Sequence, residues 1–280
     1  MPSLAGSLLR GALLSPFRRP RPDAAFPRAP LTLSGVRIDL ARLAAYERIC
    51  GFPTGDDALP PTYPHVLGFP LAMRLMSARD FPLPLLGLVH TGFDLTRYTP
   101  LPATAAYELS VRVEGLAPHR RGTEATVLTE LRAGGEVVWE SHSTYLARHR
   151  TDRAADKANV TEKTAPPPTL PPLAEWRLGG DLGRRYAAVS GDRNPIHLHP
   201  LTARLFGYPR PIAHGMWTVA RCLAAHGTPG AVRVRARFLA PVPLPGTVEY
   251  AAGNGRFTLR GDGRTHVTGI VERLGSGPRR

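Results

Sequence analysis

The chain has 280 residues, enough for one large domain or for two domains of roughly 100–150 residues each. Its hydrophobic content of 42% allows a packed core, which excludes general disorder. The longest apolar stretch, residues 81–89, is interrupted by prolines and is too short to cross a bilayer, so the composition excludes an integral membrane protein.

The formal net charge of +14 and the pI near 10.9 raise the question of a nucleic-acid partner. Lys157 and Lys163 are the only lysines, and the arginines are spread along the chain instead of being gathered on one basic helix. We interpret the charge as a composition bias and expect no nucleic-acid binding. Cys50 and Cys222 are far apart in the sequence, which indicates two core thiols in a reducing cytoplasm, with neither a disulfide framework nor a cysteine-based metal site.

Two segments are predicted to lie outside the folded domains. Residues 1–34 carry several prolines and arginines and are expected to form a disordered, solvated tail; a cleaved transit peptide is the weaker alternative, so we expect a cytoplasmic protein. Residues 151–172 contain a run of three prolines and almost no large apolar side chain, which predicts an extended linker. The linker divides the chain into a domain at 35–150 and a domain at 173–275.

Taken in chain order, the two halves show the same sequence of predicted elements. In the first half, a helix at 63–76 is followed by strands at 88–98, 107–114, 123–132 and 136–148. In the second half, a helix at 211–226 is followed by strands at 232–238, 247–252, 256–260 and 264–273. Alternation is clearest at 232–238, where small or apolar residues alternate with arginines, as expected for a sheet with one wet face.

A helix followed by an antiparallel meander buries the apolar face of the sheet on that helix. The predicted fold is therefore α+β, with a sheet wrapped around a helix twice in one chain. The two sheets could pair edge to edge, which would protect their exposed strands and make a pseudo-dimer within one chain; a homodimer of whole chains stays open.

Residues 186–200 contain the highest density of side chains that can take part in acid–base chemistry. A short helix is followed by Gly191 and Pro195, which impose an irregular loop. That loop carries Asp192 and His197, a carboxylate and an imidazole that could converge on one point. Because an imidazole titrates near neutral pH and a nearby carboxylate can tune it or share a water with it, the loop predicts proton-transfer chemistry.

A second candidate element begins at His214-Gly215-Met216-Trp217, where the second predicted helix starts. Gly215 has no side chain to block a ligand, and the first amides of a helix point outward with positive potential. An oxygen that acquires negative charge is stabilised at such a position. Together with the loop, this predicts chemistry beside a carbonyl group, with an enolate-like intermediate.

Residues 190–197, Ser-Gly-Asp-Arg-Asn-Pro-Ile-His, followed by Ala-His-Gly-Met at 213–216, closely resemble the hydratase-2 motif of the MaoC-like dehydratase family. That family includes (R)-specific enoyl-CoA hydratases and has the hot-dog fold. Residues 238–242 also look like the strand-to-turn segment of the family. The resemblance is strong over 186–250 and weak over the first half, which implies a double hot-dog whose N-terminal copy is degenerate.

The resemblance implies a hydro-lyase that needs no cofactor and acts on an acyl thioester carried by coenzyme A or acyl carrier protein. Asp192 and His197 would activate the water that adds to C3 of an enoyl thioester, and one of them would return a proton to C2. Asn194 would orient His197 or the loop, and the Gly215 amide would bind the thioester oxygen. The first half would shape the acyl pocket. His199 departs from a position that is often acidic in the family.

Several candidates have a simpler interpretation. His214 and Met216 are assigned to substrate binding. For His214, a capping residue or a support for its neighbours is favoured over a base, and Asn194 could simply stabilise the turn. Arg233 and Arg235 are also assigned to substrate binding, as contacts to a coenzyme A phosphate, but a solvated strand face explains them more simply. A metal pair of His197 and His199 lacks a third ligand, so no metal is expected.

Two rival functions remain from the sequence. A hot-dog thioesterase is possible because a fold does not fix a reaction. A non-catalytic acyl-thioester-binding subunit is the other alternative. Acyl length, carrier, direction and stereochemistry are beyond what the sequence determines.

Overall fold

The computed structural model describes residues 20–151 and 170–275; the predicted tail up to residue 19 and most of the predicted linker, 152–169, lie outside the described residues. The described residues form one antiparallel sheet in the order β1-β3-β4-β5-β2-β7-β10-β9-β8-β6. Its strands are β1 (Leu31–Arg37), β2 (Val89–Arg97), β3 (Ala106–His119), β4 (Gly122–Ala133), β5 (Glu136–Arg148), β6 (Pro172–Leu178), β7 (Val232–Phe238), β8 (Gly246–Gly253), β9 (Arg256–Gly261) and β10 (Arg264–Arg273). The helices are α2 (Leu40–Cys50), α3 (Tyr63–Ser77), α4 (Leu182–Ser190), α5 (Pro200–Leu205) and α6 (Gly215–His226), with a 3-10 helix η3 (Pro195–His197).

The sheet consists of two copies of one topology. Read from its two outer edges, the strand order is 1-3-4-5-2 in the first half and 6-8-9-10-7 in the second, so that each strand corresponds to the strand five places later. Each half also places its long helix, α3 or α6, between the first and second strands of its copy. The duplication that the sequence pattern predicts is therefore present in the connectivity.

The two copies join at the centre of the sheet, where β2 and β7 pair antiparallel from Gly92 opposite Arg237 to Arg97 opposite Val232. This pairing removes the two edges that isolated copies would expose. One hydrophobic core runs across the join, because side chains of both copies belong to the same buried cluster. The predicted edge-to-edge pairing is confirmed.

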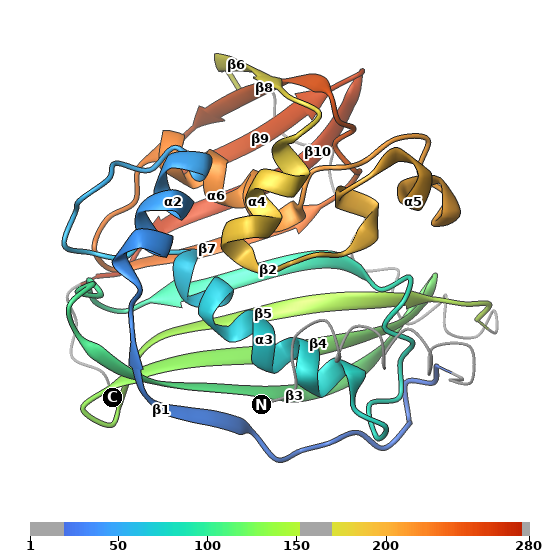
Figure 1. Ribbon diagram of the computed structural model, residues 1–280, viewed down its shortest axis with the longest axis horizontal. Helices are drawn as coiled ribbons and strands as arrows, with labels where there is room; N and C mark the ends of the chain where they lie inside the picture. The colour runs from blue at the N-terminus through green and yellow to red at the C-terminus, as the bar shows by residue number, and fades with distance from the viewer. Residues whose placement is uncertain (1–19, 152–169, 276–280) are drawn as a thin grey trace.

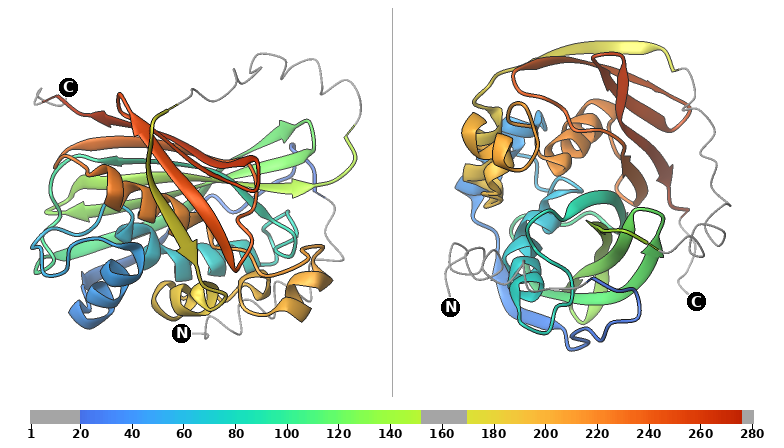
Figure 2. Two further views of the ribbon diagram at one scale, coloured as in Figure 1. Left: turned by 90° about the horizontal axis from the view of Figure 1, so that it is seen from above. Right: turned by 90° about the vertical axis from the view of Figure 1, so that its right-hand side faces the viewer.

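The helices cover one face of the sheet, and the sheet curls around them (Figures 1 and 2). Alternation along β7 explains this: Val232, Val234 and Ala236 are fully buried toward the helices, while the arginines between them lie on the other face. Figure 1 also shows α2, which comes from the first half of the chain, beside α4 and α6 of the second half. The second copy is thus completed by a helix of the first.

Most predicted elements are confirmed, and β5 and β10 match the predicted ranges residue for residue. The prediction that the tail extends to residue 34 is wrong, because β1 begins at Leu31 and pairs with β3. The two outer-edge strands and α2 were not predicted. Helix α6 begins at Gly215 instead of residue 211, because Ala213 N–H donates to Val242 O at 2.8 Å and Ile212 bridges to Pro243.

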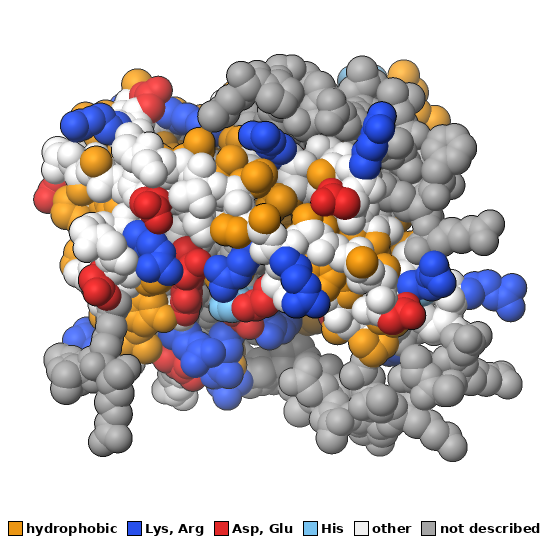
Figure 3. Space-filling view, turned by 90° about the horizontal axis from the view of Figure 1, so that it is seen from below, with side chains coloured by type: hydrophobic (Ala, Val, Ile, Leu, Met, Phe, Trp, Pro, Cys, Tyr) orange, Lys and Arg blue, Asp and Glu red, His pale blue; other side chains and the backbone are white. Residues whose placement is uncertain are grey.

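Within the described residues, no helix has both the length and the apolar character needed to cross a membrane. The surface charges are mixed in sign. On the face shown in Figure 3, basic and acidic side chains are interspersed instead of forming one basic patch. Ion pairs account for part of this mixing, such as Arg112 with Glu130 at 2.7 Å and Arg235 with Glu272 at 2.7 Å.

Candidate active site

The candidate site begins where α4 ends. Gly191 terminates the helix in the left-handed conformation, with φ of 82°, which a glycine adopts without strain. Arg42 of α2 donates from Nε to the carbonyl oxygen of Val189 at 2.7 Å and from Nη2 to that of Ser190 at 3.3 Å. A cation from the first half therefore satisfies the last carbonyls of α4, immediately before the loop that carries Asp192.

Three side-chain-to-backbone hydrogen bonds shape this loop. The Ser190 hydroxyl accepts from the Asp192 amide at 3.2 Å, and Asp192 Oδ1 accepts from the Asn194 amide at 3.1 Å. Asn194 Oδ1 accepts from the Ile196 amide at 3.4 Å and so caps η3. The Asn194 side chain thus stabilises the backbone of the turn, and its role in orienting His197 stays a prediction.

His197, at the end of η3, is 8% exposed. Its Nδ1 lies 2.7 Å from the carbonyl oxygen of Ile212, which can only accept, so Nδ1 carries the proton and Nε2 presents a lone pair. Burial lowers the pKa of His197, while the Asp192 charge and the Ile212 carbonyl raise it in part. The ring is therefore a neutral base with its free nitrogen defined by the backbone.

His214 stacks on His197 with ring centroids 3.7 Å apart. Its Nε2 donates to the backbone oxygen of Asp192 at 2.9 Å and lies 3.9 Å from Asp192 Oδ2. Burial and the neighbouring His197 hold the pKa of His214 well below its usual value. His214 occupies the N-cap position of α6 without capping it with its side chain, so its ring joins the start of α6 to the Asp192 loop.

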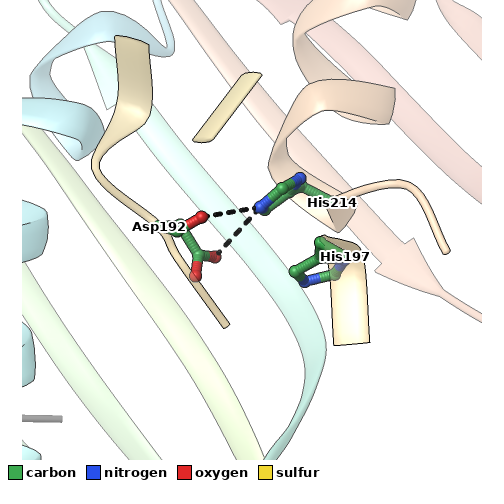
Figure 4. Close-up of side chains that lie close together, drawn as sticks. All are labelled: Asp192, His197 and His214. Carbon is green, nitrogen blue, oxygen red and sulfur yellow. Dashed lines mark hydrogen bonds and ion pairs between the residues drawn. The ribbon is translucent and has the colours of Figure 1, made fainter. Parts of the chain in front are cut away.

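The structure brings Asp192, His197 and His214 together, with one polar atom of each within 4.8 Å of the others (Figure 4). Asp192 is the member that reaches solvent, with 28% of its side chain exposed. The same three residues could hold a metal ion, although His214 Nε2 already donates to the Asp192 backbone oxygen. His199 takes no part, because it caps α5 through the Leu201 amide.

The N-terminus of α6 lies beside this cluster. Gly215 is its first residue, so its amide has no acceptor within the helix, and no side chain caps the position. A Cβ at Gly215 would come within 2.9 Å of the Phe238 ring. The glycine is therefore needed for the close approach of β7 to the helix start.

The remaining predicted substrate-binding residues are not brought to the cluster. Arg233 and Arg235 lie on the outer face of the sheet, opposite the helices, and Arg235 is paired with Glu272. Because the sheet separates them from Asp192, their assignment to the site is corrected to the solvated strand face. Met216 is next to Gly215 but buried in the core, at 7% exposure.

The first half contributes a group of aromatic and imidazole side chains that sequence reasoning missed. His90 of β2 stacks on Tyr145 of β5 at 4.6 Å and contacts Phe238 at 4.8 Å between ring centroids. His65 of α3 is 7% exposed, and burial lowers its pKa to about 4, although the Asp192 charge raises it in part. His65 Nδ1 and His90 Nε2 have no hydrogen-bond partner among the described residues. No local sequence signal ties these residues to Asp192.

Gly183 and Arg42 were also missed, and each supports the loop. A Cβ at Gly183 would lie 1.9 Å from the backbone oxygen of His197, so α4 packs directly on η3. The signal for α2 was present: Asp39 accepts from the amides of Ala41 and Arg42, and the helix ends at Gly51. An N-cap aspartate followed by helically spaced apolar residues predicts such a helix.

A neutral imidazole, a solvent-accessible carboxylate and an uncapped helix N-terminus together form an acid–base site for carbonyl chemistry. On a double hot-dog, this combination defines a protein of the acyl-thioester hydratase and dehydratase class. Comparison with known proteins identifies the family within this class.

The MaoC-like domain model matches residues 173–270. The chain is 39% identical to the 3-hydroxyacyl-thioester dehydratase X of Mycobacterium tuberculosis over 98% of this chain and 99% of that protein. It is also 30% identical to the peroxisomal enoyl-CoA hydratase 2 of Arabidopsis thaliana, over 57% of each chain. The crystal structure of HtdX from Mycobacterium tuberculosis superposes with a TM-score of 0.76 at 37% identity, covering 88% of this chain and all of that one.

This chain therefore belongs to the MaoC-like dehydratase family. The predicted family, the double hot-dog fold and the hydro-lyase class are confirmed. The roles of individual site residues, the absence of a cofactor and the cytoplasmic location stay predictions.

Proposed function

We propose that this protein catalyses the reversible addition of water to the double bond of an enoyl thioester, giving a 3-hydroxyacyl thioester. The observation that supports the proposal most directly is the convergence of Asp192 and His197 beside the start of α6, in a chain 39% identical to a 3-hydroxyacyl-thioester dehydratase.

In the hydration direction, the thioester oxygen is bound by the Gly215 amide at the helix N-terminus, where the developing enolate charge is stabilised. The substrate water is held between Asp192 and His197 Nε2, and one of the two removes a proton as the oxygen bonds to C3. The C2 carbanion of the enolate then takes a proton from one of these groups. Dehydration follows the same steps in reverse.

The supporting residues keep this arrangement in place. The Ile212 carbonyl holds the His197 tautomer with Nε2 free, and His214 holds the Asp192 backbone. Phe238 of the second half packs with His90 of the first, and His90 stacks on Tyr145; we propose that this aromatic group faces the acyl chain. The proposed chemistry uses no cofactor, and coenzyme A or a carrier protein serves only to carry the acyl group.

The test is to incubate the purified protein with trans-2-enoyl-CoA substrates of increasing chain length. Absorbance of the conjugated thioester reports hydration, a thiol reagent reports hydrolysis, and chiral analysis identifies the 3-hydroxy product. We expect loss of the enoyl absorbance with no free thiol. Release of free thiol as fast as the enoyl absorbance is lost would establish a thioesterase instead. Binding of the substrate without turnover would establish a non-catalytic subunit.

A further inference from the structure

Helix α5 presents two leucines to solvent directly after the candidate catalytic loop. Leu201 is 63% exposed and Leu205 is 82% exposed, the largest exposure among the large hydrophobic residues described. Their spacing of four residues places them on one face of the helix, and Arg204, also exposed, lies between them. Leu201, Arg204 and Leu205 are called the α5 surface below. Figure 1 shows α5 at the periphery of the molecule, away from the sheet.

The opposite side of α5 is fixed to the catalytic loop. The Thr202 hydroxyl donates to the backbone oxygen of Pro195 at 2.7 Å, and Ala203 is fully buried. His199 Nδ1 accepts from the Leu201 amide at 3.2 Å and defines the helix start. The two leucines are therefore exposed on a helix that is anchored to η3, the element that carries His197, and the exposure does not come from an unattached loop.

The chain segment that carries this surface has an excess of basic residues. From residue 182 to residue 214, Asp192 is the only acidic residue. The same segment carries exposed arginines on α4, on the catalytic loop and around α5, namely Arg184, Arg185, Arg193, Arg204 and Arg210. Among these, Arg185 lies 4.0 Å from Asp181 and Arg210 lies 3.9 Å from Asp262. An exposed apolar pair next to Arg204, in a segment with an excess of arginines, fits a protein partner that offers an acidic, partly apolar face.

We propose that the α5 surface docks an acidic acyl carrier protein, which delivers the enoyl or 3-hydroxyacyl thioester to Asp192 and His197. This inference rests on the proposed function, and it goes further by naming the carrier and the surface that recognises it. A thioester on a carrier protein must bring a folded partner next to the site. The α5 surface follows His197 by only a few residues, while Asp192 is the member of the cluster that reaches solvent. Opposite charge speeds the encounter, and the two leucines supply apolar contact.

The experiment compares one acyl group on two carriers. The same trans-2-enoyl group is attached to coenzyme A and to an acidic bacterial acyl carrier protein, and kcat/KM is measured for both. The variants are Leu205→Glu and Arg204→Glu, which place negative charge on the α5 surface. The matched control is Arg256→Glu, an exposed arginine at the end of β9 opposite to the end near Asp262.

We expect each α5 variant to lower kcat/KM for the carrier-protein substrate about 10-fold or more, as loss of an interface anchor does. The coenzyme A substrate should change less than about twofold, which also shows that the variants fold. Arg256→Glu should leave both substrates unchanged.

Equal kcat/KM of wild type and α5 variants on the carrier-protein substrate would overturn the proposal, as would equal losses on both carriers. A wild-type dimer that Leu205→Glu dissociates, without a selective loss on the carrier protein, would assign the surface to a second copy. If wild type hydrates neither substrate, the proposed function itself has failed.

Discussion

At the scale of single residues, the candidate site is defined by backbone atoms as much as by side chains. His197 has a free Nε2 because Nδ1 donates to the Ile212 carbonyl, and His214 is oriented by the Asp192 carbonyl. Burial lowers the pKa of both rings, so they are neutral at neutral pH. The carboxylate of Asp192 is thus the formal negative charge of a cluster that is otherwise neutral and polar.

The first prediction concerns the two groups proposed to handle protons. Asp192→Asn and His197→Ala should each lower kcat for enoyl-thioester hydration by about 100-fold or more, because each removes an acid–base group. The measurement is the rate of loss of the conjugated thioester absorbance at saturating substrate, with circular dichroism as the check on folding.

The control is His199→Asn, two residues after His197. His199 only caps α5, and asparagine is also a good N-cap, so activity should stay within about threefold of wild type. Wild-type activity in either Asp192→Asn or His197→Ala would remove that residue from the mechanism.

At the scale of elements, the position of His197 depends on the direct packing of α4 against η3. Gly183 lies in the first turn of α4, and no side chain fits between it and the His197 backbone. At the other end of α4, Arg42 holds the last carbonyls. The catalytic loop is therefore fixed at both ends of α4. Gly183 allows η3 to pack directly on the helix, and Arg42 from the first half binds the last carbonyls.

The second prediction follows from this packing. Gly183→Ala should push η3 away from α4 and lower kcat by about 10-fold or more, because small displacements of a catalytic group are costly. Gly180→Ala is the matched control, since a Cβ there meets only Pro245 at 3.6 Å. Both variants are assayed for hydration and for thermal unfolding. Unchanged kcat in Gly183→Ala would show that the loop does not rely on this contact.

At the scale of the whole molecule, the join between the two copies buries imidazoles from both. His65 comes from α3, His90 from β2, and His197 and His214 from the second half; burial lowers the pKa of all four. In the unfolded chain a histidine titrates near 6.5. As the pH falls below about 6.5, the unfolded state binds protons that the folded state does not, so stability decreases with falling pH.

The third prediction tests this linkage at His65, whose folded pKa is about 4. Between pH 7.5 and pH 5, His65 alone should cost about 2 kcal/mol of unfolding free energy, and the loss should level off below about pH 3. His65→Phe keeps an aromatic ring and removes the titration. The drop in unfolding free energy between these two pH values, measured by urea titration, should be about 2 kcal/mol smaller in the variant than in wild type. An equal drop in both proteins would contradict the assignment.

The sequence by itself determined the elements that depend on neighbouring residues. The turn glycine, the Asn-Pro step and the helix caps of residues 190–200 are local features, and alternation along 136–148 and 264–273 located β5 and β10 residue for residue. The repeat of a helix before a meander was readable for the same reason. The motif, the family and the convergence of Asp192 and His197 in one cluster could therefore be predicted from the amino-acid order alone.

Only the tertiary structure decided what depends on residues far apart in the chain. Arg42 and the carbonyl that it holds are separated by 147 residues. The edge strand β1 is stabilised by pairing with β3, and this pairing cannot be predicted from the residues of β1 alone. The pleat of β7 turns Arg233 and Arg235 away from the site, while the β2–β7 join brings His90 against Phe238 beside Gly215. Local patterns set the faces and turns of each element, but which faces meet is fixed by burial in a shared core.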